Sequence, residues 1–599
     1  MAVWFAWLVV ANVFLQASIG PRLVAWHPER FDIGWTRAWT LVPGLAHVRG
    51  FWCGGHVRNT RWRIEIDRAV VLVNVPALVT RTFHGLWPRA SGVRATIERT
   101  DDFVEPRQRR RPGFRIVLYG VRATDVGHLE LAGMGVDGIR AVTGTVDTRA
   151  RGLLSIPVAE ARVVDGRIDL GGETVAEDLR LDARLRIAPY VPGEHRDTGP
   201  LPFLSGRVDV DGRLGDLSIV RAFLRNTPML DLEGGRARVD GAVVLDHGRV
   251  VDPTDLTISE ASYAVRYLDD VVATGTGRIY GGRATGAEGE ALRFELESFE
   301  LSRPDAPAAY ARGRDLAVRV LAEQLDLVEA GEQVAIVVDV PSAEVLDVGA
   351  FDVYLPATSR LQLVGGTGRL SSWIDLDLRT NSGAASLDLE ADDVEARLGE
   401  RALRGDLEVR GKFVVQDPRS RRFEITSLAV DLDDVAVSGE RRHRSTDTTG
   451  GWWSHTQVTA GTVRLTKPIE LDAEVEIQAM DARPVFALVE DRKAALAWVD
   501  RLLDTDDVSG SARLVTSGPG IELRNLELEA GATRISGEIC VHGEDSTMVI
   551  LGAIRDRHIG LERTPQGSDW KLREPTEWFR ARREEFRCAA SAETPGEVR

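Results

Sequence analysis

The chain has 599 residues, of which 43% are hydrophobic, and this size predicts several folded domains rather than a disordered polymer. Asp and Glu number 91 against 75 Lys and Arg, and the net charge of −16 argues against a nucleic-acid partner. The three cysteines, Cys53, Cys540 and Cys588, are too few and too far apart for a disulfide framework or a zinc site. We expect small, partly buried thiols there, with a single disulfide as the alternative.

An uncharged apolar run covers residues 3–20 near the N-terminus. As a helix it is just long enough to cross a hydrocarbon core of about 30 Å. No basic residue precedes the run and no small-residue cleavage site ends it, so we expect an uncleaved anchor over residues 1–20. A cleaved signal peptide and a buried helix are the alternatives. Arg22, Arg30 and Arg37 follow the run and by charge would hold the rest of the chain in the cytoplasm, although large domains often translocate regardless.

Alternation of apolar and polar residues recurs along most of the chain. Because successive side chains of a strand point to opposite faces, this alternation predicts strands with one apolar face each. We expect hairpin turns at His247-Gly248 and at 381–383. The apolar positions also change parity within some stretches, as between Leu432 and Val435, which predicts bulges or short turns that bend the sheet.

The apolar members of these strands are the candidate functional residues. A closed sandwich would pack them against a second sheet, whereas an open groove would reserve them for a lipid chain. Burying one CH₂ group stabilises by about 0.8 kcal/mol, so sheltering a chain of about sixteen carbons contributes roughly 13 kcal/mol. Periodicity alone does not separate the two arrangements. The candidate lining consists of Val208, Val210, Val239, Val243, Leu245, Leu376, Leu378, Leu387, Leu389, Phe423, Ile425, Leu428, Val430, Leu432, Val463, Leu465, Leu471, Val475 and Ile477.

Helical periodicity is scarce. Residues 485–503 carry an apolar stripe, and we expect this helix to cover strand edges at one end of the groove. A second helix is expected over residues 310–325, and a terminal helix over 576–587 after Pro575.

Catalytic and metal-binding motifs are absent from the sequence. It contains no H-E-x-x-H, C-x-x-C, P-loop or G-x-S-x-G motif, and its eleven histidines show no ligand spacing. The acidic stretch 431–434 alternates with Leu432 and is typical of the wet face of a strand. We therefore expect a protein that is not an enzyme and that needs no metal and no cofactor.

Two stretches resemble a known family. Residues 34–55, GWTRAWTLVPGLAHVRGFWCGG, lead through a Pro-Gly turn into a first strand, and 61–100 continue as strand, helix (75–83) and strand. Residues 485–539 read as a helix, a short acidic linker, a Ser-Gly strand start and two alternating strands ending in I-S-G. This order is similar to that of the AsmA-like proteins, relatives of the TamB and YhdP proteins in the bridge-like, repeating-β-groove lipid transfer group.

The resemblance implies a mainly β fold. An N-terminal transmembrane helix (1–20) would precede an elongated, twisted and curled antiparallel sheet that forms an open apolar groove with a few short helices. Residues 21–100 would start the groove and 101–480 would repeat it. Residues 481–575 would form the C-terminal AsmA-like helix and strands, and 576–599 a terminal helix with a disordered tail.

The resemblance also implies a function. The chain would be a single-pass inner-membrane protein with its bulk in the periplasm of a Gram-negative cell, held by its N-terminal helix. It would bind phospholipid or another acyl lipid, carry it between the inner and outer membranes, and so support outer-membrane biogenesis and envelope integrity, with envelope proteins as further partners. The alternative is a periplasmic structural or outer-membrane assembly factor that binds protein partners through its sheets. A continuous apolar surface favours the first function, and separate closed cores favour the second.

Overall fold

A computed structural model gives the fold of the chain. The structure describes residues 2–16, 31–104, 115–131, 134–148, 153–170, 173–191, 200–217, 230–267, 271–286, 289–322, 325–326, 334–356, 361–398, 401–417, 421–438, 448–481, 507–517, 520–542, 545–586 and 588.

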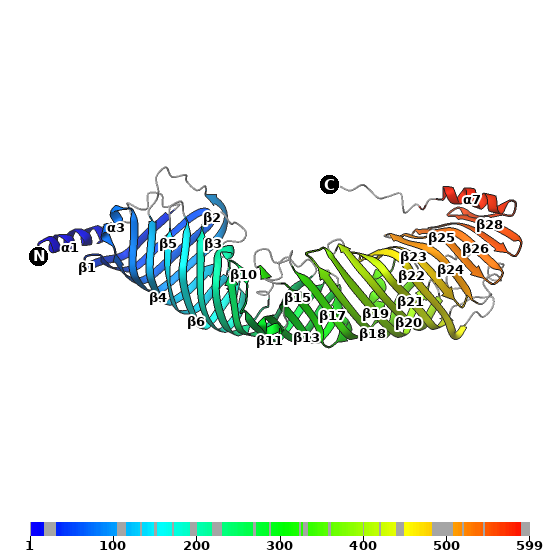
Figure 1. Ribbon diagram of the computed structural model, residues 1–599, viewed down its shortest axis with the longest axis horizontal. Helices are drawn as coiled ribbons and strands as arrows, with labels where there is room; N and C mark the ends of the chain where they lie inside the picture. Colours follow the sequence, from blue (N-terminus) through cyan, green and yellow to red (C-terminus); the bar gives the residue numbers. More distant parts are fainter. Residues whose placement is uncertain are drawn as a thin grey trace. The chain divides into compact units, whose positions relative to one another are not determined.

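The protein is mainly β, as expected, and its described residues form one large, mostly antiparallel sheet of 29 strands with a few short helices (Figure 1). The chain divides into two compact units. Unit 1 comprises residues 1–269, 274–295 and 319–333, and unit 2 comprises 270–273, 296–318 and 334–599.

Among the described residues, the helices are α1 (Ala2–Gln16), α3 (Val75–Val79) and α7 (Pro575–Glu585), with 3₁₀ turns η2 (Leu201–Phe203), η3 (Arg283–Thr285) and η4 (Val348–Tyr354). The first strands are β1 (Phe31–Val42), β2 (Leu45–Val73), β3 (Thr82–Val104), β4 (Arg115–Leu131), β5 (Met134–Thr148), β6 (Leu154–Leu170), β7 (Glu173–Tyr190), β8 (Leu204–Leu214), β9 (Leu230–Asp246), β10 (Arg249–Val250), β11 (Asp255–Tyr267), β12 (Val271–Gly282), β13 (Glu290–Arg303), β14 (Ala306–Gly313), β15 (Leu316–Leu321) and β16 (Leu325–Asp326). The others are β17 (Ala335–Val345), β18 (Leu361–Asp377), β19 (Ser382–Leu398), β20 (Arg401–Asp417), β21 (Arg422–Ser438), β22 (Thr448–Arg464), β23 (Glu470–Ala479), β24 (Val508–Ser517), β25 (Gly520–Ala530), β26 (Thr533–His542), β27 (Asp545–Ile554), β28 (Arg557–Thr564) and β29 (Gly567–Lys571).

In unit 1, strands β1 to β9 pair in chain order, and β11 follows β9. The pair β3–β4 is parallel and places Arg115 opposite Thr82. A straight strand as long as the 23-residue β3 would measure about 75 Å, whereas the ten residues 105–114 can reach about 40 Å at most. The two ends of β3, Thr82 and Val104, must therefore lie much closer together than in a straight strand. The sheet of unit 1 is strongly curled.

In unit 2, β14 pairs with β13 and β17, and strands β17 to β29 then pair antiparallel in chain order. Each of these strands pairs with the strands before and after it in the chain. The register therefore shows which side chains of successive strands lie on the same face of the sheet.

The bulges predicted where the apolar positions change parity are present in the strands. Asp434 has φ 49° where the register shifts between Leu432 and Val435, and Asn525 has φ 53° at the corresponding shift in β25. Asp and Asn tolerate this left-handed conformation better than most residues. Each bulge adds residues that bend the strand and returns the next apolar side chain to the same face.

The expected hairpin turn at His247-Gly248 is confirmed, with φ values of 51° and 80° between β9 and β10. The β18–β19 hairpin closes through residues 378–381, slightly earlier than expected. The prediction of a helix over residues 310–325 is wrong, because strands β14 and β15 occupy this segment. Leu316, Val318 and Val320 are buried with a period of two, and this strand pattern prevails over the helix-forming residues between them.

Two of the other predicted helices are present in the structure. The terminal helix is present as α7, and the helix after Asn74 is present but shorter than expected, as α3. The helix expected over 485–503 lies outside the described residues, as does the tail after Cys588. In the described part of the chain, no helix has the length and apolar character needed to cross a bilayer.

The C-terminal helix α7 lies beside β28 (Figure 1) and contacts β27 and β28. Arg582 forms an ion pair with Glu562, and Arg583 with Glu538. Contrary to the expectation of separate thiols, Cys540 and Cys588 form a disulfide with a Cα–Cα distance of 5.7 Å. This bridge ties the end of α7 to β26, whereas Cys53 is a free thiol.

Candidate functional site: the apolar face of the sheet

The main candidate site is a set of apolar rows that cross the strands of unit 2. Residues directly opposite each other in neighbouring strands carry their side chains on the same face. One row runs from β18 to β28 through Leu370, Leu389, Val409, Val430, Thr456, Ile477, Gly510, Leu528, Ile535, Gly552 and Ile559. Only Thr456 in this row is polar. With about 4.8 Å between strands, the ten steps cover roughly 48 Å.

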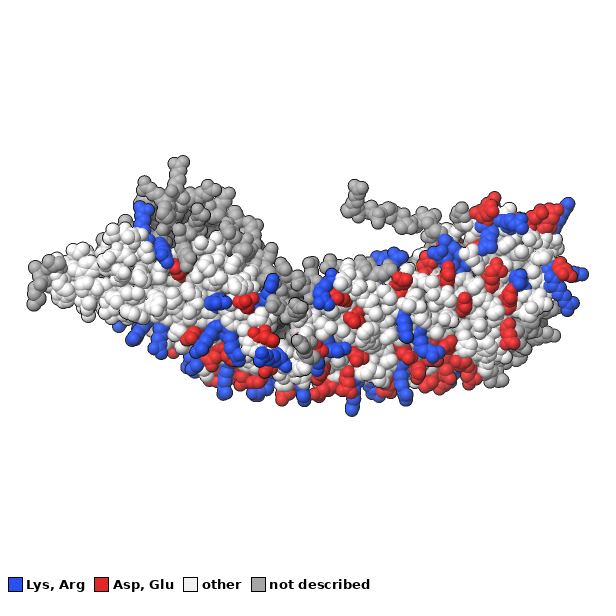
Figure 2. All heavy atoms as spheres, viewed as in Figure 1, with Lys and Arg blue, Asp and Glu red and all other residues white. Residues whose placement is uncertain are grey.

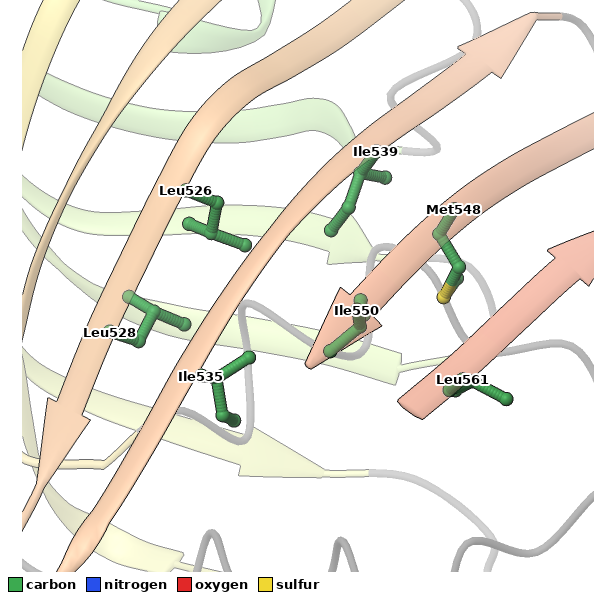
Figure 3. Close-up of a cluster of buried hydrophobic side chains, with 7 residues drawn as sticks. All are labelled: Leu526, Leu528, Ile535, Ile539, Met548, Ile550 and Leu561. Atoms are coloured by element: carbon green, nitrogen blue, oxygen red, sulfur yellow. The ribbon is translucent and has the colours of Figure 1, made fainter. Parts of the chain in front are cut away.

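A second row lies on the same side, two residues along each strand. It passes through Leu387, Leu428, Val458 and Val475, with Gly411 in β20. We call the surface formed by these two rows and the buried cluster of β25–β28 the apolar face of unit 2. Figure 3 shows that cluster, whose seven side chains are Leu526, Leu528, Ile535, Ile539, Met548, Ile550 and Leu561.

The opposite face of the same strands is polar. One position along from the first row, the register connects Arg369, Glu390, Glu408, Asp431, His455, Gln478, Ser509, Glu529 and Arg534. Figure 2 shows charges of both signs spread over the strands of unit 2 on the viewed side. Many are paired: Arg513 donates to Asp472 at 2.7 Å, and this hydrogen bond lowers the pKa of the Asp472 carboxyl.

Twelve of the fourteen predicted lining residues of unit 2 share the apolar face. Through the register, Leu376, Leu387, Leu389, Phe423, Ile425, Leu428, Val430, Leu432, Val463, Leu471, Val475 and Ile477 all point to one side. Two predicted residues lie outside the strands: Leu378 is in the β18–β19 turn, and Leu465 directly follows β22.

Unit 1 has an apolar face of its own. Opposite residues form a row from β3 to β11 through Val93, Val126, Ile139, Val163, Leu181, Val210, Gly241 and Leu256. The predicted residues Val208, Val210, Val239, Val243 and Leu245 are on this side of β8 and β9. The acidic residues between them, Asp209 and Asp211, are on the other side.

A short helical segment that the sequence did not reveal lies on the apolar face of unit 2. Val348 in η4 is fully buried in one cluster with Leu389, Ala391 and Val394, and Phe351 packs against the same cluster. The rings of Tyr310 and Phe351 meet edge to face, with centroids 5.6 Å apart. Burial raises the pKa of the Tyr310 hydroxyl. The only local signal was Asp347, whose carboxylate accepts from the backbone of Gly349 as an N-cap.

The segment around η4 also shows that the sheet of unit 2 curls toward its apolar face. Asp352 accepts from the backbone N–H of Leu363 in β18, and the carbonyl of Tyr354, two residues later, accepts from Ile469 just before β23. The backbone nitrogens of Leu363 and Ile469 therefore lie within about 17 Å of each other. On a flat sheet, five strand spacings alone would separate them by about 24 Å. Because η4 contacts the apolar side, that side is the concave one at β18–β23.

Groups capable of other chemistry lie on the polar side. Asp388, Glu390 and Glu408 bring three carboxylates together, but the first two are exposed and Arg410 forms an ion pair with Glu408. In unit 1, His128 contacts Asp137 at 2.8 Å, and this hydrogen bond lowers the pKa of the Asp137 carboxyl, with Arg167 assisting. Both groups are surface ion-pair networks, so the apolar face remains the main candidate.

No family model, curated protein or solved structure matches this chain. The likeness to the AsmA-like proteins therefore stays a prediction made from the residues quoted above.

Proposed function

We propose that the protein holds acyl chains of lipids along the apolar face of unit 2 and acts as a lipid carrier or bridge in a bacterial envelope. The observation that carries the proposal is the row from Leu370 to Ile559, which stays apolar or glycine over eleven strands apart from one threonine. Water in contact with such a row is costly. Each CH₂ group that replaces it contributes about 0.8 kcal/mol.

Partial exposure of the apolar face of unit 2 supports this proposal. Val430, Val475 and Ile477 are only half-buried, although they lie on the concave side of the sheet. A closed sandwich would bury such residues almost fully. Side chains that remain accessible on a concave apolar surface suit a ligand that is itself apolar and extended.

The disulfide supports an extracytoplasmic location. Disulfides persist in oxidising compartments such as the periplasm and are rare in the cytosol. The Cys540–Cys588 bridge therefore agrees with a chain whose bulk lies in the periplasm. We propose that the apolar α1, whose Phe5 and Val10 are exposed, holds the N-terminal end at the inner membrane.

One observation favours the alternative, a structural protein with closed cores. Under η4, Leu389 is buried in a cluster with Val348 and Ala391, so at this point a protein segment already covers the apolar face. The two functions differ in whether the purified protein contains bound lipid. A lipid carrier retains lipid wherever η4 does not reach, whereas a structural protein retains none.

Native mass spectrometry of the purified full-length chain tests the proposal. After gentle removal of detergent, we expect one or more phospholipids bound to each chain. A spectrum of the bare chain alone, from a preparation that is folded by circular dichroism, would leave the structural alternative.

A further inference from the structure

One end of unit 1 exposes large apolar side chains from three separate elements. At the turn between β1 and β2, Leu41 is 62% exposed and Val42 is 54% exposed. At the end of α3, Val79 is 87% exposed. The two tips are neighbours, because the N–H of Val73, just before α3, donates to the carbonyl of Gly44 in the β1–β2 turn at 2.7 Å.

The helix α1 joins the same end. Asn12 in the helix bonds to the backbone of Thr40, one residue before Leu41. Exposed side chains of α1, including Phe5 and Val10, extend this apolar end. Figure 2 shows the surface of α1 itself without charge. We call Leu41, Val42, Leu78 and Val79 the apolar tip.

Behind the apolar tip, the β1–β2 hairpin becomes aromatic and then basic. Trp39 and His47 are paired in register and stack with ring centroids 5.3 Å apart. Two residues further from the turn, Arg37 is paired with Arg49. Both guanidinium groups lie over the Trp39 ring, at 5.6 Å (Arg37) and 5.5 Å (Arg49) from its centroid. Among the described residues, neither arginine forms an ion pair with a carboxylate.

This order matches the depth profile of a lipid leaflet. Two residues of a strand span about 7 Å, so the aromatic pair lies about 7 Å and the arginine pair about 13 Å behind Leu41. Apolar groups that penetrate a bilayer surface reach about 5–10 Å into the boundary between headgroups and acyl chains. Tryptophan favours the interface, and guanidinium groups bind lipid phosphates.

We propose that the apolar tip inserts into one leaflet of an anionic lipid bilayer and that Arg37 and Arg49 bind the phosphates of its headgroups. The inference rests on the proposed function, for which it names the membrane contact. Two neighbouring arginines that have no carboxylate partner in the described part of the chain repel each other unless an anion lies between them, and this favours a phosphate-bearing surface over a neutral protein partner.

The test places a fluorescent probe at the tip of the full-length chain. In a Cys53→Ser background, Val42→Cys is labelled with bimane, and Val158→Cys serves as the matched control, because Val158 in β6 is 53% exposed. Burial raises the pKa of Cys53 to about 11, so this thiol reacts slowly, and the substitution removes it altogether. The labelled chains are incorporated into phosphatidylcholine vesicles with or without phosphatidylglycerol, which contain nitroxide-labelled lipid.

We expect lipid nitroxide to quench the probe at position 42 at least fivefold more than the probe at 158. Arg37→Gln with Arg49→Gln should remove the extra quenching that phosphatidylglycerol gives at position 42. Equal quenching at both positions would overturn the proposal, and so would a chain that does not bind vesicles. A probe shielded from water but not quenched by lipid would identify a protein contact instead. Bound phospholipid, measured on the same samples by native mass spectrometry, reports on the proposed function separately.

Discussion

The side-chain amide of Asn12 forms two hydrogen bonds with the backbone of Thr40. Its nitrogen donates to the Thr40 carbonyl and its oxygen accepts from the Thr40 N–H, both at 2.9 Å. Thr40 pairs with Ala46 of β2 on its other side, so Asn12 occupies the place of a strand partner at the outer edge of β1. Exposed strand edges are templates for aggregation, and α1 shields this one.

Asn12→Leu should release α1 from β1. The change removes both hydrogen bonds and leaves the N–H and C=O of Thr40 without their partner, at a cost of about 1–3 kcal/mol. Hydrogen exchange should show faster exchange of the Thr40 amide, with the amides in the middle of β5 unchanged. Val10→Leu, an exposed position on the same helix, is the control. Slow exchange at Thr40 in Asn12→Leu would show that the contact does not hold the edge.

An aspartate at Val430 should block lipid binding without unfolding the protein. Val430 is half-buried on the apolar face, so the carboxylate stays hydrated until an acyl chain covers it, and an unpaired buried charge is costly. We expect bound phospholipid to fall several-fold by mass spectrometry while the melting temperature stays near that of the wild type. Gln457→Asp, on the polar face of the next strand, is the matched control and should retain lipid.

Leu389→Asp should behave differently. Leu389 lies under η4 beside Val348, so the same substitution buries a charge in a closed cluster. We expect a loss of unfolding free energy of about 3 kcal/mol or more, measured by urea denaturation. If Leu389→Asp and Val430→Asp melt alike, η4 does not cover the face as described.

The β18–β19 hairpin should make stability sensitive to acid. The side chain of Arg379 donates to Asp377 at 2.8 Å and lowers the pKa of this carboxyl to about 2. A carboxyl whose folded pKa is depressed stabilises the fold above its ordinary pKa, near 4, and loses this contribution as the pH falls toward 2. Asp377→Asn and Arg379→Gln should both reduce the fall in urea midpoint between pH 5 and pH 3. Unchanged acid sensitivity in both variants would contradict this.

The disulfide should fix α7 to the sheet. Cys540 and Cys588 are 48 residues apart, and closing a loop of this length stabilises by up to about 4 kcal/mol in the chain-entropy model. Reduction should make α7 accessible to limited proteolysis after Arg582 or Arg583. The double variant Cys540→Ser with Cys588→Ser should behave like the reduced wild type and should not respond to reductant. Equal proteolysis of the oxidised and reduced proteins would show that α7 is held in place without the disulfide.

Local patterns predicted much of this structure. The period of two places Leu526 and Leu528 on one face, and the parity change after Leu523 marks the bulge at Asn525, because both depend only on neighbouring residues. Contacts between distant residues could not be predicted in this way. The bond between Tyr354 and Ile469 and the disulfide need the curl of the sheet and the position of α7, which no local pattern contains.

Photo-crosslinking from the two faces of one strand shows whether lipid chains lie on the apolar face of unit 2. Benzoylphenylalanine is placed at Val475, which is opposite Val458 on the apolar face, or at the adjacent, exposed Glu476 on the polar face. We expect irradiation of the full-length chain in membranes to attach phospholipid at position 475 and not at 476. Adducts at neither position, or equally at both, would contradict an apolar face that holds lipid chains.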